Sequence, residues 1–204
     1  MSTRNQIRGE NTRREILQAA NDLFTRQGFH GTSMRQIAQQ AGIALGGVYN
    51  HFASKEEVFR EVFFEYHPYH EVLPVLLDSQ QLGVEQFVRD AFNRILLALQ
   101  NRPNFMNLLF IEIVEFKGMH SHELFEQLMP DEMMIVKGLV ETNRDRLRSI
   151  PPWMLLRAFF GLLFSYYLTE LLLAEQAPEE FSHGAVDHMI DIFLHGVLKD
   201  NKRS

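Results

Sequence analysis

Apolar residues recur along this chain at intervals of three and four positions, which is the spacing of one face of an α-helix. The first such stripe consists of Ile16, Leu17, Ala20, Leu23 and Phe24. Later stripes keep the same period, and no stretch of useful length alternates apolar and polar residues as a half-buried strand does. The pattern therefore predicts an all-α fold of about nine helices, with no internal repeat.

Short helices with clear boundary signals are expected in the N-terminal part. A Ser or Thr followed three residues later by Glu or Gln marks a helix start, because the two residues can cap each other's free backbone N–H groups. Gly28 and Gly42 can supply the left-handed residue that ends a helix, and a third short helix is expected over 45–51. Three candidate capping pairs are present: Thr12 with Glu15, Ser33 with Gln36, and Ser54 with Glu57.

Longer helices are expected in the rest of the chain. Pro103 is suited to the first turn of a helix. Pro130 instead lies inside a periodic apolar stretch and predicts a kink or two separate segments there. The expected helices cover 84–99, 103–117, 121–147, 151–174 and 179–199.

The composition is that of a globular chain with a sizeable core, since 46% of its 204 residues are hydrophobic. The chain has no Cys, which excludes disulfides, thiolate metal ligands and a Cys nucleophile. Residues 1–15 are polar and lack the apolar segment of a secretory signal. The uncharged stretch 158–169 is shorter than the about 20 residues of a membrane span. We therefore expect a core or interface helix there and no membrane association.

Charge is distributed unevenly along the chain. Residues 1–60 hold eight Arg or Lys and five Asp or Glu, whereas residues 61–204 hold twelve and 21. A basic N-terminal part and an acidic remainder suggest that residues 1–60 bind a polyanion, such as a nucleic acid, and that residues 61–204 do not.

Residues 34–52 have the proportions of a helix-turn-helix, with two short helices joined around Gly42. In this motif the second short helix lies in the DNA major groove, with its N-terminal residues nearest the bases. Gly46 and Gly47 open that helix, although glycine inside a helix costs about 1 kcal/mol relative to alanine. Glycine has no Cβ and lets backbone N–H groups come close to phosphates or base edges. A loosely formed helix start that tolerates glycine is the alternative, and the spacing supports both equally.

Four pieces of the sequence, LFTRQGFHGTSM, RQIAQQAG, GGVYNHF and SKEEV, follow one another at consistent spacing within residues 12–59. Together they resemble the N-terminal domain of TetR-family transcriptional regulators. The rest of the chain resembles that family only in its helical layout. The resemblance implies a three-helix helix-turn-helix DNA-binding domain over 1–53. It also implies a larger helical effector-binding and dimerisation domain over 54–204, with 54–70 as the linking helix.

The resemblance also implies a function. The expected protein is a cytoplasmic, ligand-responsive repressor that binds a palindromic double-stranded DNA operator as a homodimer and is released by a small hydrophobic effector. No catalytic activity and no cofactor are implied. A helical adaptor for other proteins and an enzyme acting on a hydrophobic small molecule are the alternatives. The basic N-terminal block argues against the adaptor, and the sequence has no nucleophile elbow or phosphate-binding glycine loop for the enzyme.

The family pattern also implies which residues contact DNA. Arg35 falls where a base or phosphate contact is made, and Thr32 and Ser33 are expected to cap the second helix and to lie near phosphate. Lys55, at the start of the fourth helix, matches a recurrent phosphate contact, because a helix N-terminus and an ammonium group both favour an anion. The full expected set is Thr32, Ser33, Arg35, Leu45, Gly46, Gly47, Tyr49, Asn50, His51 and Lys55.

The recognition helix departs from the family pattern at its start. Many relatives have Ser-Lys or Ser-Arg where this chain has Ala44 and Leu45, so both the expected cap and the expected cation are absent. Leu45 could instead contact a thymine methyl group, and Asn50 could read adenine. Fewer charge contacts here predict weaker non-specific affinity and a gentler salt dependence.

The larger domain is expected to bind a hydrophobic effector and to hold the dimer together. By resemblance, helices 151–174 and 179–199 pack against a second copy, and the first of them is apolar on nearly every face. A surplus of Phe and Met favours a mostly apolar pocket with a few polar groups, for which His67, His70, Glu112 and Glu115 are available. Taken singly, each candidate is more simply explained as ordinary core. The candidate pocket residues are Phe63, Tyr66, Phe92, Met106, Phe110, Phe159 and Tyr166.

Two histidine pairs have the spacing of metal ligands, namely His67 with His70 and His120 with His122. The chain has no Cys and the sequence brings no tight cluster together. Solvated histidines at helix ends are the simpler explanation, and no metal site is predicted.

Overall fold

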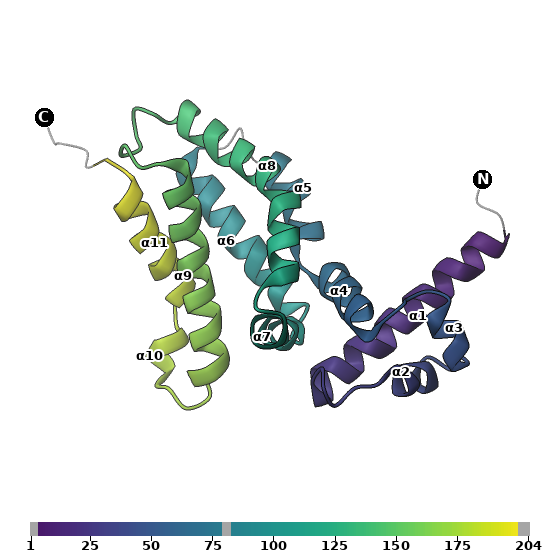
Figure 1. The fold of residues 1–204 in the computed structure, drawn as a ribbon. Coiled ribbons are helices and arrows are strands. Elements are labelled where there is room, and N and C mark those ends of the chain that lie inside the picture. The colour runs from purple at the N-terminus through teal and green to yellow at the C-terminus, as the bar shows by residue number, and fades with distance from the viewer. Residues whose placement is uncertain (1–3, 79–82, 200–204) are drawn as a thin grey trace, which may run out of the picture. The chain divides into compact units, whose positions relative to one another are not determined.

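The computed structural model describes residues 4–78 and 83–199, and the regular elements in these ranges are helices (Figure 1). The prediction of an all-α fold is confirmed. The same ranges contain one isolated β-bridge, between Leu147 and Leu198. The helices are α1 (Arg4–Gln27), α2 (Met34–Gln40), α3 (Leu45–Tyr49), α4 (Lys55–Tyr66), α5 (Tyr69–Asp78), α6 (Val84–Gln100), α7 (Phe105–Phe116), α8 (Met119–Thr142), α9 (Pro152–Leu173), α10 (Glu179–Ser182) and α11 (Ala185–Val197).

One of the three predicted capping pairs is formed in full, and a second is formed on one side. The Ser33 hydroxyl accepts a hydrogen bond from the backbone N–H of Gln36, and the Gln36 side chain accepts one from the Ser33 backbone. The Ser54 hydroxyl caps α4 by accepting from the Glu57 backbone N–H, whereas the Glu57 carboxylate accepts from the backbone N–H of Ala53 and not from that of Ser54. Gly28 and Gly42 have φ angles of +76° and +70°, in the left-handed region that glycine adopts without a steric penalty. These two glycines end α1 and α2 as predicted.

Several helix boundaries were predicted wrongly. α1 begins at Arg4, so Thr12 and Glu15 lie inside it and cannot cap its start. α8 is one helix that contains Pro130, which excludes two separate segments, and the alternative of a kink stays a prediction. A proline inside a helix costs about 3 kcal/mol, and burial of apolar neighbours such as Met133 can offset this cost. α3 is shorter than expected, α5 was not expected, and the expected helix 179–199 is divided into α10 and α11.

The chain divides into two compact units. The first unit contains residues 1–67 and 102–126, and the second contains residues 68–101 and 127–204. The first unit therefore holds α4, α7 and the beginning of α8 together with the three N-terminal helices. A functional boundary after residue 53 stays a prediction.

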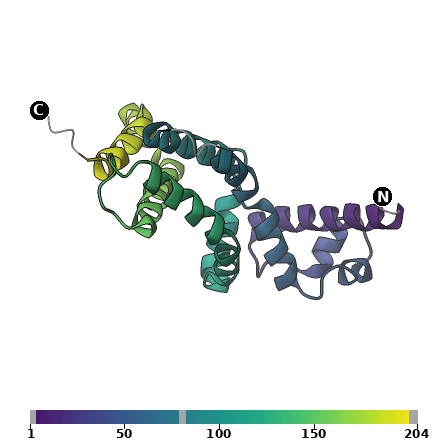
Figure 2. The same ribbon diagram turned by 90° about the horizontal axis from the view of Figure 1, so that it is seen from above.

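An aromatic cluster around Phe59 of α4 forms the centre of the first unit. The Phe59 ring stacks on Phe116 of α7, with the ring centroids 4.7 Å apart. It meets Phe24 of α1 edge-on at 5.4 Å and Phe29 at 5.8 Å. On α4 itself, Phe63 continues the cluster. α1 also packs on α2 and α4, and α2 packs on α3 (Figure 2), so one ring from α4 joins the N-terminal helices to α7.

A buried carboxylate organises the turn between α7 and α8. Lys117 and Gly118 both have positive φ angles there. Glu112 is completely buried and accepts hydrogen bonds from the backbone N–H groups of His120 and Ser121, at 2.7 and 3.0 Å. The His120 ring Nδ1 donates to the other Glu112 oxygen at 2.7 Å. Glu112 thus caps the first turn of α8, where anionic groups are stabilising.

Ion pairs supplement this packing within the first unit. Arg60 of α4 donates two hydrogen bonds to Glu123 of α8, one of them 2.8 Å long from Nε. This paired hydrogen bonding holds the pKa of Glu123 below its usual range and raises the pKa of Arg60. His30, after α1, lies 2.6 Å from Glu115 of α7.

The second unit is built from α5, α6, the later part of α8, α9, α10 and α11. α11 packs on both α6 and α9. Arg89 of α6 pairs with Asp187 and Asp191 of α11. Arg146, after α8, pairs with Glu85 at the start of α6.

We predict that Phe59→Ala destabilises the protein by about 3–5 kcal/mol, because it removes a fully buried ring that contacts two other helices. Urea unfolding followed by circular dichroism measures this change. Ile7→Ala is the control, since Ile7 is exposed and its loss should change stability by less than about 0.5 kcal/mol. A similar small effect of both substitutions would contradict the role given to Phe59.

Candidate nucleic-acid interface and apolar cavity

α3 is anchored to the first unit by a single side chain of its own. Val48 is completely buried and is the one buried residue of the helix. Phe52, three residues beyond the end of α3, is also buried. The other side chains of the helix therefore remain at the surface, as a groove-reading helix requires.

Most of the residues predicted to contact DNA lie on this exposed surface. Tyr49 keeps 52% of its surface exposed, which is high for an aromatic residue next to a core position. The outward-facing positions are Ser33, Arg35, Leu45, Gly46, Tyr49 and Asn50, whereas Gly47 and His51 are half-buried.

The fold itself does not require glycine at the start of α3. Gly46 and Gly47 both lack a positive φ. A Cβ built on Gly46 meets nothing within 4 Å, and one on Gly47 would touch only Ile43 at an ordinary 3.5 Å. Internal packing and backbone conformation therefore do not explain the two glycines, and both leave room for an external group close to the backbone.

Thr32 does not fit the predicted DNA-contacting set. Its side chain is 2% exposed, and its hydroxyl donates to the backbone carbonyl of Gly28 at 2.9 Å. The hydroxyl therefore stabilises the turn between α1 and α2 and does not face solvent. Ser33, not Thr32, is the N-cap of α2. We leave Thr32 out of the interface that we propose below.

Lys55 has a structural role that the sequence did not reveal. Its Nζ donates to the backbone carbonyls of Phe29 and Thr32, at 2.8 Å each. The same ammonium lies 4.1 Å from the centroid of the Phe29 ring. Lys55 thus ties the start of α4 to the turn that precedes α2. Its predicted phosphate contact stays a prediction, with one ammonium hydrogen left after these two bonds.

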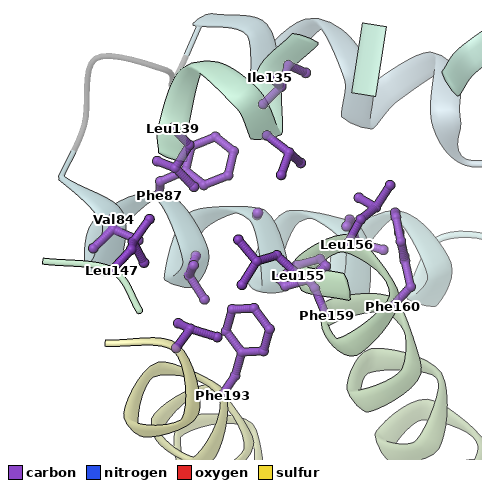
Figure 3. A pocket seen from close by; sticks show the side chains of 15 residues that line it. Val84, Phe87, Ile135, Leu139, Leu147, Leu155, Leu156, Phe159, Phe160 and Phe193 are labelled. Carbon is purple, nitrogen blue, oxygen red and sulfur yellow. The ribbon is translucent and has the colours of Figure 1, made fainter. Parts of the chain in front are cut away.

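An apolar cavity of about 80 Å³ lies inside the second unit (Figure 3). α6 contributes one wall, the end of α8 another, and α9 and α11 close it. None of the lining residues is polar or charged: they are Val84, Phe87, Val88, Ala91, Ile95, Ile135, Val136, Leu139, Leu147, Leu155, Leu156, Phe159, Phe160, Phe193 and Val197. Such a cavity suits an uncharged hydrocarbon group and offers no partner for a charge.

One of the seven predicted pocket residues, Phe159, lines this cavity. Phe92 and Tyr166 belong to the same unit, and the centroid of the Phe92 ring lies 5.9 Å from that of Phe159 and 6.2 Å from that of Tyr166. Burial raises the pKa of the Tyr166 hydroxyl. Phe92 thus contacts a residue of the wall and Tyr166 contacts Phe92, but neither lines the cavity.

The other four predicted pocket residues belong to the first unit. Phe63 and Met106 are buried there, and Phe63 stacks on Phe105. Tyr66 is half-buried, with a hydroxyl pKa raised mainly by burial, whereas Phe110 is 40% exposed. None of these four lines the cavity of the second unit.

Three of the four polar candidates for the pocket, Glu112, Glu115 and His67, contact other residues of the first unit. Glu112 caps α8, and Glu115 pairs with His30. The His67 ring meets Phe105 edge-on at 5.0 Å. His70 is exposed. The part of the chain that the structure describes contains no group of three or more His, Asp or Glu placed to hold a metal ion.

Most of the cavity wall was missed by sequence reasoning. Five of its residues, Val84, Phe87, Val88, Ala91 and Ile95, form an apolar stripe with helical spacing along α6. The stripe indicates which face is inward. It does not indicate where packing leaves a void, because that depends on how the side chains of four helices meet.

α9 exposes a long apolar surface. It is 22 residues long and apolar enough to cross a membrane by length and composition, yet only 11% of its most apolar stretch is buried within this chain. The uncharged stretch 158–169 was too short to indicate this. The exposed apolar residues of α9 are Trp153, Met154, Phe160, Phe164, Leu171, Leu172 and Leu173.

Comparison with known proteins identifies relatives of both parts of the chain. The family model for bacterial regulatory proteins of the tetR family matches residues 16–62. The HTH-type transcriptional regulator UidR of Escherichia coli (strain K12) is 35% identical over 148 residues, which cover 69% of this chain and 68% of UidR. The HTH-type transcriptional regulator YfiR of Bacillus subtilis (strain 168) is 46% identical over 48 residues, or 23% of its own length.

A solved structure extends the likeness in fold to nearly the whole chain. NalD, the secondary repressor of the MexAB-OprM multidrug efflux pump in Pseudomonas aeruginosa, superposes with a TM-score of 0.71 at 23% identity. The superposition covers 94% of this chain and 99% of NalD.

We predict that Lys55→Met destabilises the protein by about 1–3 kcal/mol, because the aliphatic stem is kept while two carbonyl groups lose a charged donor. Thermal and urea unfolding measure the loss. Lys137→Met is the matched control, since Lys137 is exposed. An unchanged stability for Lys55→Met would indicate that Lys55 serves only an external partner.

Proposed function

The chain belongs to the TetR family of bacterial regulatory proteins, and on this basis we propose that it is a dimeric repressor. It binds a two-fold symmetric DNA operator through α3 and is released by a small apolar effector. Members of this family are helix-turn-helix transcriptional regulators and not enzymes. Repression is supported by the fold shared with NalD, which is itself a repressor.

The exposed surface of α3 is the observation that carries the proposal. A short helix with one buried residue would contribute little to the core for its length. Its outward side combines two glycines that packing does not explain with Tyr49 and Asn50, which can donate to phosphate or read a base edge. This combination suits entry into a major groove.

Neighbouring side chains extend this surface toward the DNA backbone. Arg35 is exposed on α2, and Ser33 is exposed at the start of the same helix. His51 and Lys55 follow α3, with the remaining ammonium hydrogen of Lys55 available for a phosphate. Contacts of this kind fix the register of the protein on DNA, while α3 supplies the sequence preference.

A second copy of the chain is the partner that best explains the exposed side of α9. An apolar surface of this extent is uncommon on a soluble monomer and marks an interaction site. Ile192 of α11 adds to it from the neighbouring helix. A two-fold dimer would present two copies of α3 to half-sites about 34–36 Å apart, or a multiple of that spacing.

The cavity between α6, α8, α9 and α11 is the site that we assign to the effector. Its lining predicts an uncharged, largely hydrocarbon ligand or ligand moiety. Release requires that the effector bind more tightly to the conformation that fits DNA poorly, and linkage then makes operator binding weaken effector binding by the same factor.

The test is an electrophoretic mobility shift with DNA from upstream of the chain's own coding sequence. The dimer should retard one fragment in the presence of excess competitor DNA. A folded dimer that retards none of these fragments would contradict the proposal.

The informative variant in this assay is Gly46→Ala. An added Cβ has room in the free protein and should stabilise it by up to about 1 kcal/mol through helix propensity. The same Cβ should keep the backbone away from DNA and weaken binding about tenfold, which corresponds to about 1.4 kcal/mol. Gly196→Ala is the control, since it adds a Cβ into open space on α11 of the second unit. Equal DNA affinities for the two variants would remove the reason given for the glycine.

The dimer has its own test in Phe164→Lys, which places a charge on the exposed side of α9. We expect the variant to sediment as a monomer and to lose specific DNA binding, since burying an unpaired charge in an interface is costly. Val114→Lys on α7 introduces the same charge at another exposed apolar position and should leave the dimer intact. A stable dimer of Phe164→Lys would show that the interface lies elsewhere.

A further inference from the structure

α1 extends well beyond the part of the chain that matches the family model. The match begins at residue 16, whereas α1 begins at Arg4. We call Arg4–Glu15 the N-terminal extension. In two perpendicular views its free end runs out past α3 (Figures 1 and 2).

The base of the extension is fixed next to the recognition surface. Arg13 pairs with Glu61 of α4, and its guanidinium lies 5.3 Å from the centroid of the Phe52 ring. Phe52 is buried directly after the segment that contains α3. The nine residues from Arg13 back to Arg4 add about 13 Å of helix at 1.5 Å per residue. The extension therefore has a defined starting point beside α3 and a reach of several base pairs.

The charges on the extension are arranged unfavourably for a helix on its own. Arg4 and Arg8 lie one turn apart, and such like-charged pairs destabilise a helix. The first turn contains no acidic residue, although acids are the favourable charges at that end. Neither arginine has an Asp or Glu three or four positions away, and Arg8 forms no ion pair with any residue that the structure describes.

The other two arginines of the extension, Arg13 and Arg14, do have partners. Arg13 has Glu61 as a partner, and Arg14 donates to Asn11 at 3.1 Å and has Glu10 one turn before it. Arg13 and Arg14, near the base, therefore have partners within the protein, whereas Arg8 has no ion pair with a described residue. An external anion would relieve the repulsion between Arg4 and Arg8.

We propose that the N-terminal extension is a second DNA-binding surface, in which Arg4 and Arg8 bind backbone phosphates flanking the base pairs that α3 faces. The inference rests on the DNA-binding function proposed above. The occupant is duplex DNA because the base of the extension holds Arg13, which lies against Phe52 just after α3, and the extension carries the complementary charge. These contacts add affinity without sequence preference, since phosphates are the same at every base pair.

Such contacts also compensate for a deficiency of α3. The start of the recognition helix has Leu45 where a basic residue would supply a phosphate contact, and Ala44 makes no side-chain cap. The extension adds two arginines to the DNA-binding part of the chain. These arginines bind phosphates at a different point on the duplex from those that α3 faces. The salt dependence of binding should then come in part from α1.

The experiment compares the full chain with its Arg4→Gln/Arg8→Gln variant. Binding to a fluorescent duplex of arbitrary sequence, and to one from the upstream region, is measured by anisotropy between 50 and 200 mM salt. Each phosphate contact contributes about 0.9 to the slope of log affinity against log salt. Loss of two contacts per protomer should lower the slope by about 1.8, so that raising the salt from 50 to 200 mM costs the variant about tenfold less affinity per protomer than the wild type.

The matched control is Arg94→Gln/Lys137→Gln, which removes two exposed cations from the second unit. Its slope should equal that of the wild type. Equal reductions in both double variants would assign the effect to net charge and overturn the proposal. An unchanged slope in Arg4→Gln/Arg8→Gln would also overturn it, while DNA binding by the wild type would leave the proposed function standing.

Hydroxyl-radical footprinting on the upstream duplex gives a positional readout. The wild type should protect sugars flanking the central contacts, and Arg4→Gln/Arg8→Gln should lose that flanking protection and keep the central protection. Identical footprints would contradict the proposal. A wild type that binds no duplex at all would overturn both the proposed function and this inference.

Discussion

The packing of Phe59 is the interaction on which the DNA-binding part of this protein depends. The recognition helix α3 cannot hold its own position, because Val48 is its one buried residue. α2 holds α3 and itself packs on α1. α1 and α4 meet at the aromatic cluster that Phe59 shares with α7. Lys55, one turn earlier on α4, fixes the turn before α2. Lys55 and Phe59, on one face of α4, thus fix the position of the surface that we assign to DNA.

The two units place their apolar residues in opposite ways. In the first unit aromatic rings fill the centre, and the exposed side of α3 is free for a polar and charged partner. In the second unit α9 has one side on an apolar cavity and the other exposed. Phe160 belongs to both sides, since it lines the cavity and is also among the exposed apolar residues. A helix of this kind requires covering from outside the chain, which is why a second copy is the simplest partner for it.

Sequence reasoning was most accurate where the signal is local. Ser33 and Gly28 act within a few residues, and their capping roles follow from backbone geometry alone. It was wrong where packing overrides a local preference. Thr12 looked like a cap because Glu15 follows it three residues later, yet α1 already begins at Arg4. Of the kink or two segments that Pro130 predicted, the two segments are excluded, because α8 runs through it as one helix.

The sequence by itself determined the helical class, the helix-turn-helix and most of its exposed residues. These features depend on helix periodicity and turn preferences, which are set by residues close together in the chain. Only the tertiary structure decided which polar groups face inward. In the folded chain Glu112 caps the start of α8, and the Thr32 hydroxyl donates to the Gly28 carbonyl. The Lys55 ammonium donates to two backbone carbonyl groups in the turn before α2. The tertiary structure also placed the cavity, since a void depends on how side chains from four helices meet and no single helix encodes that.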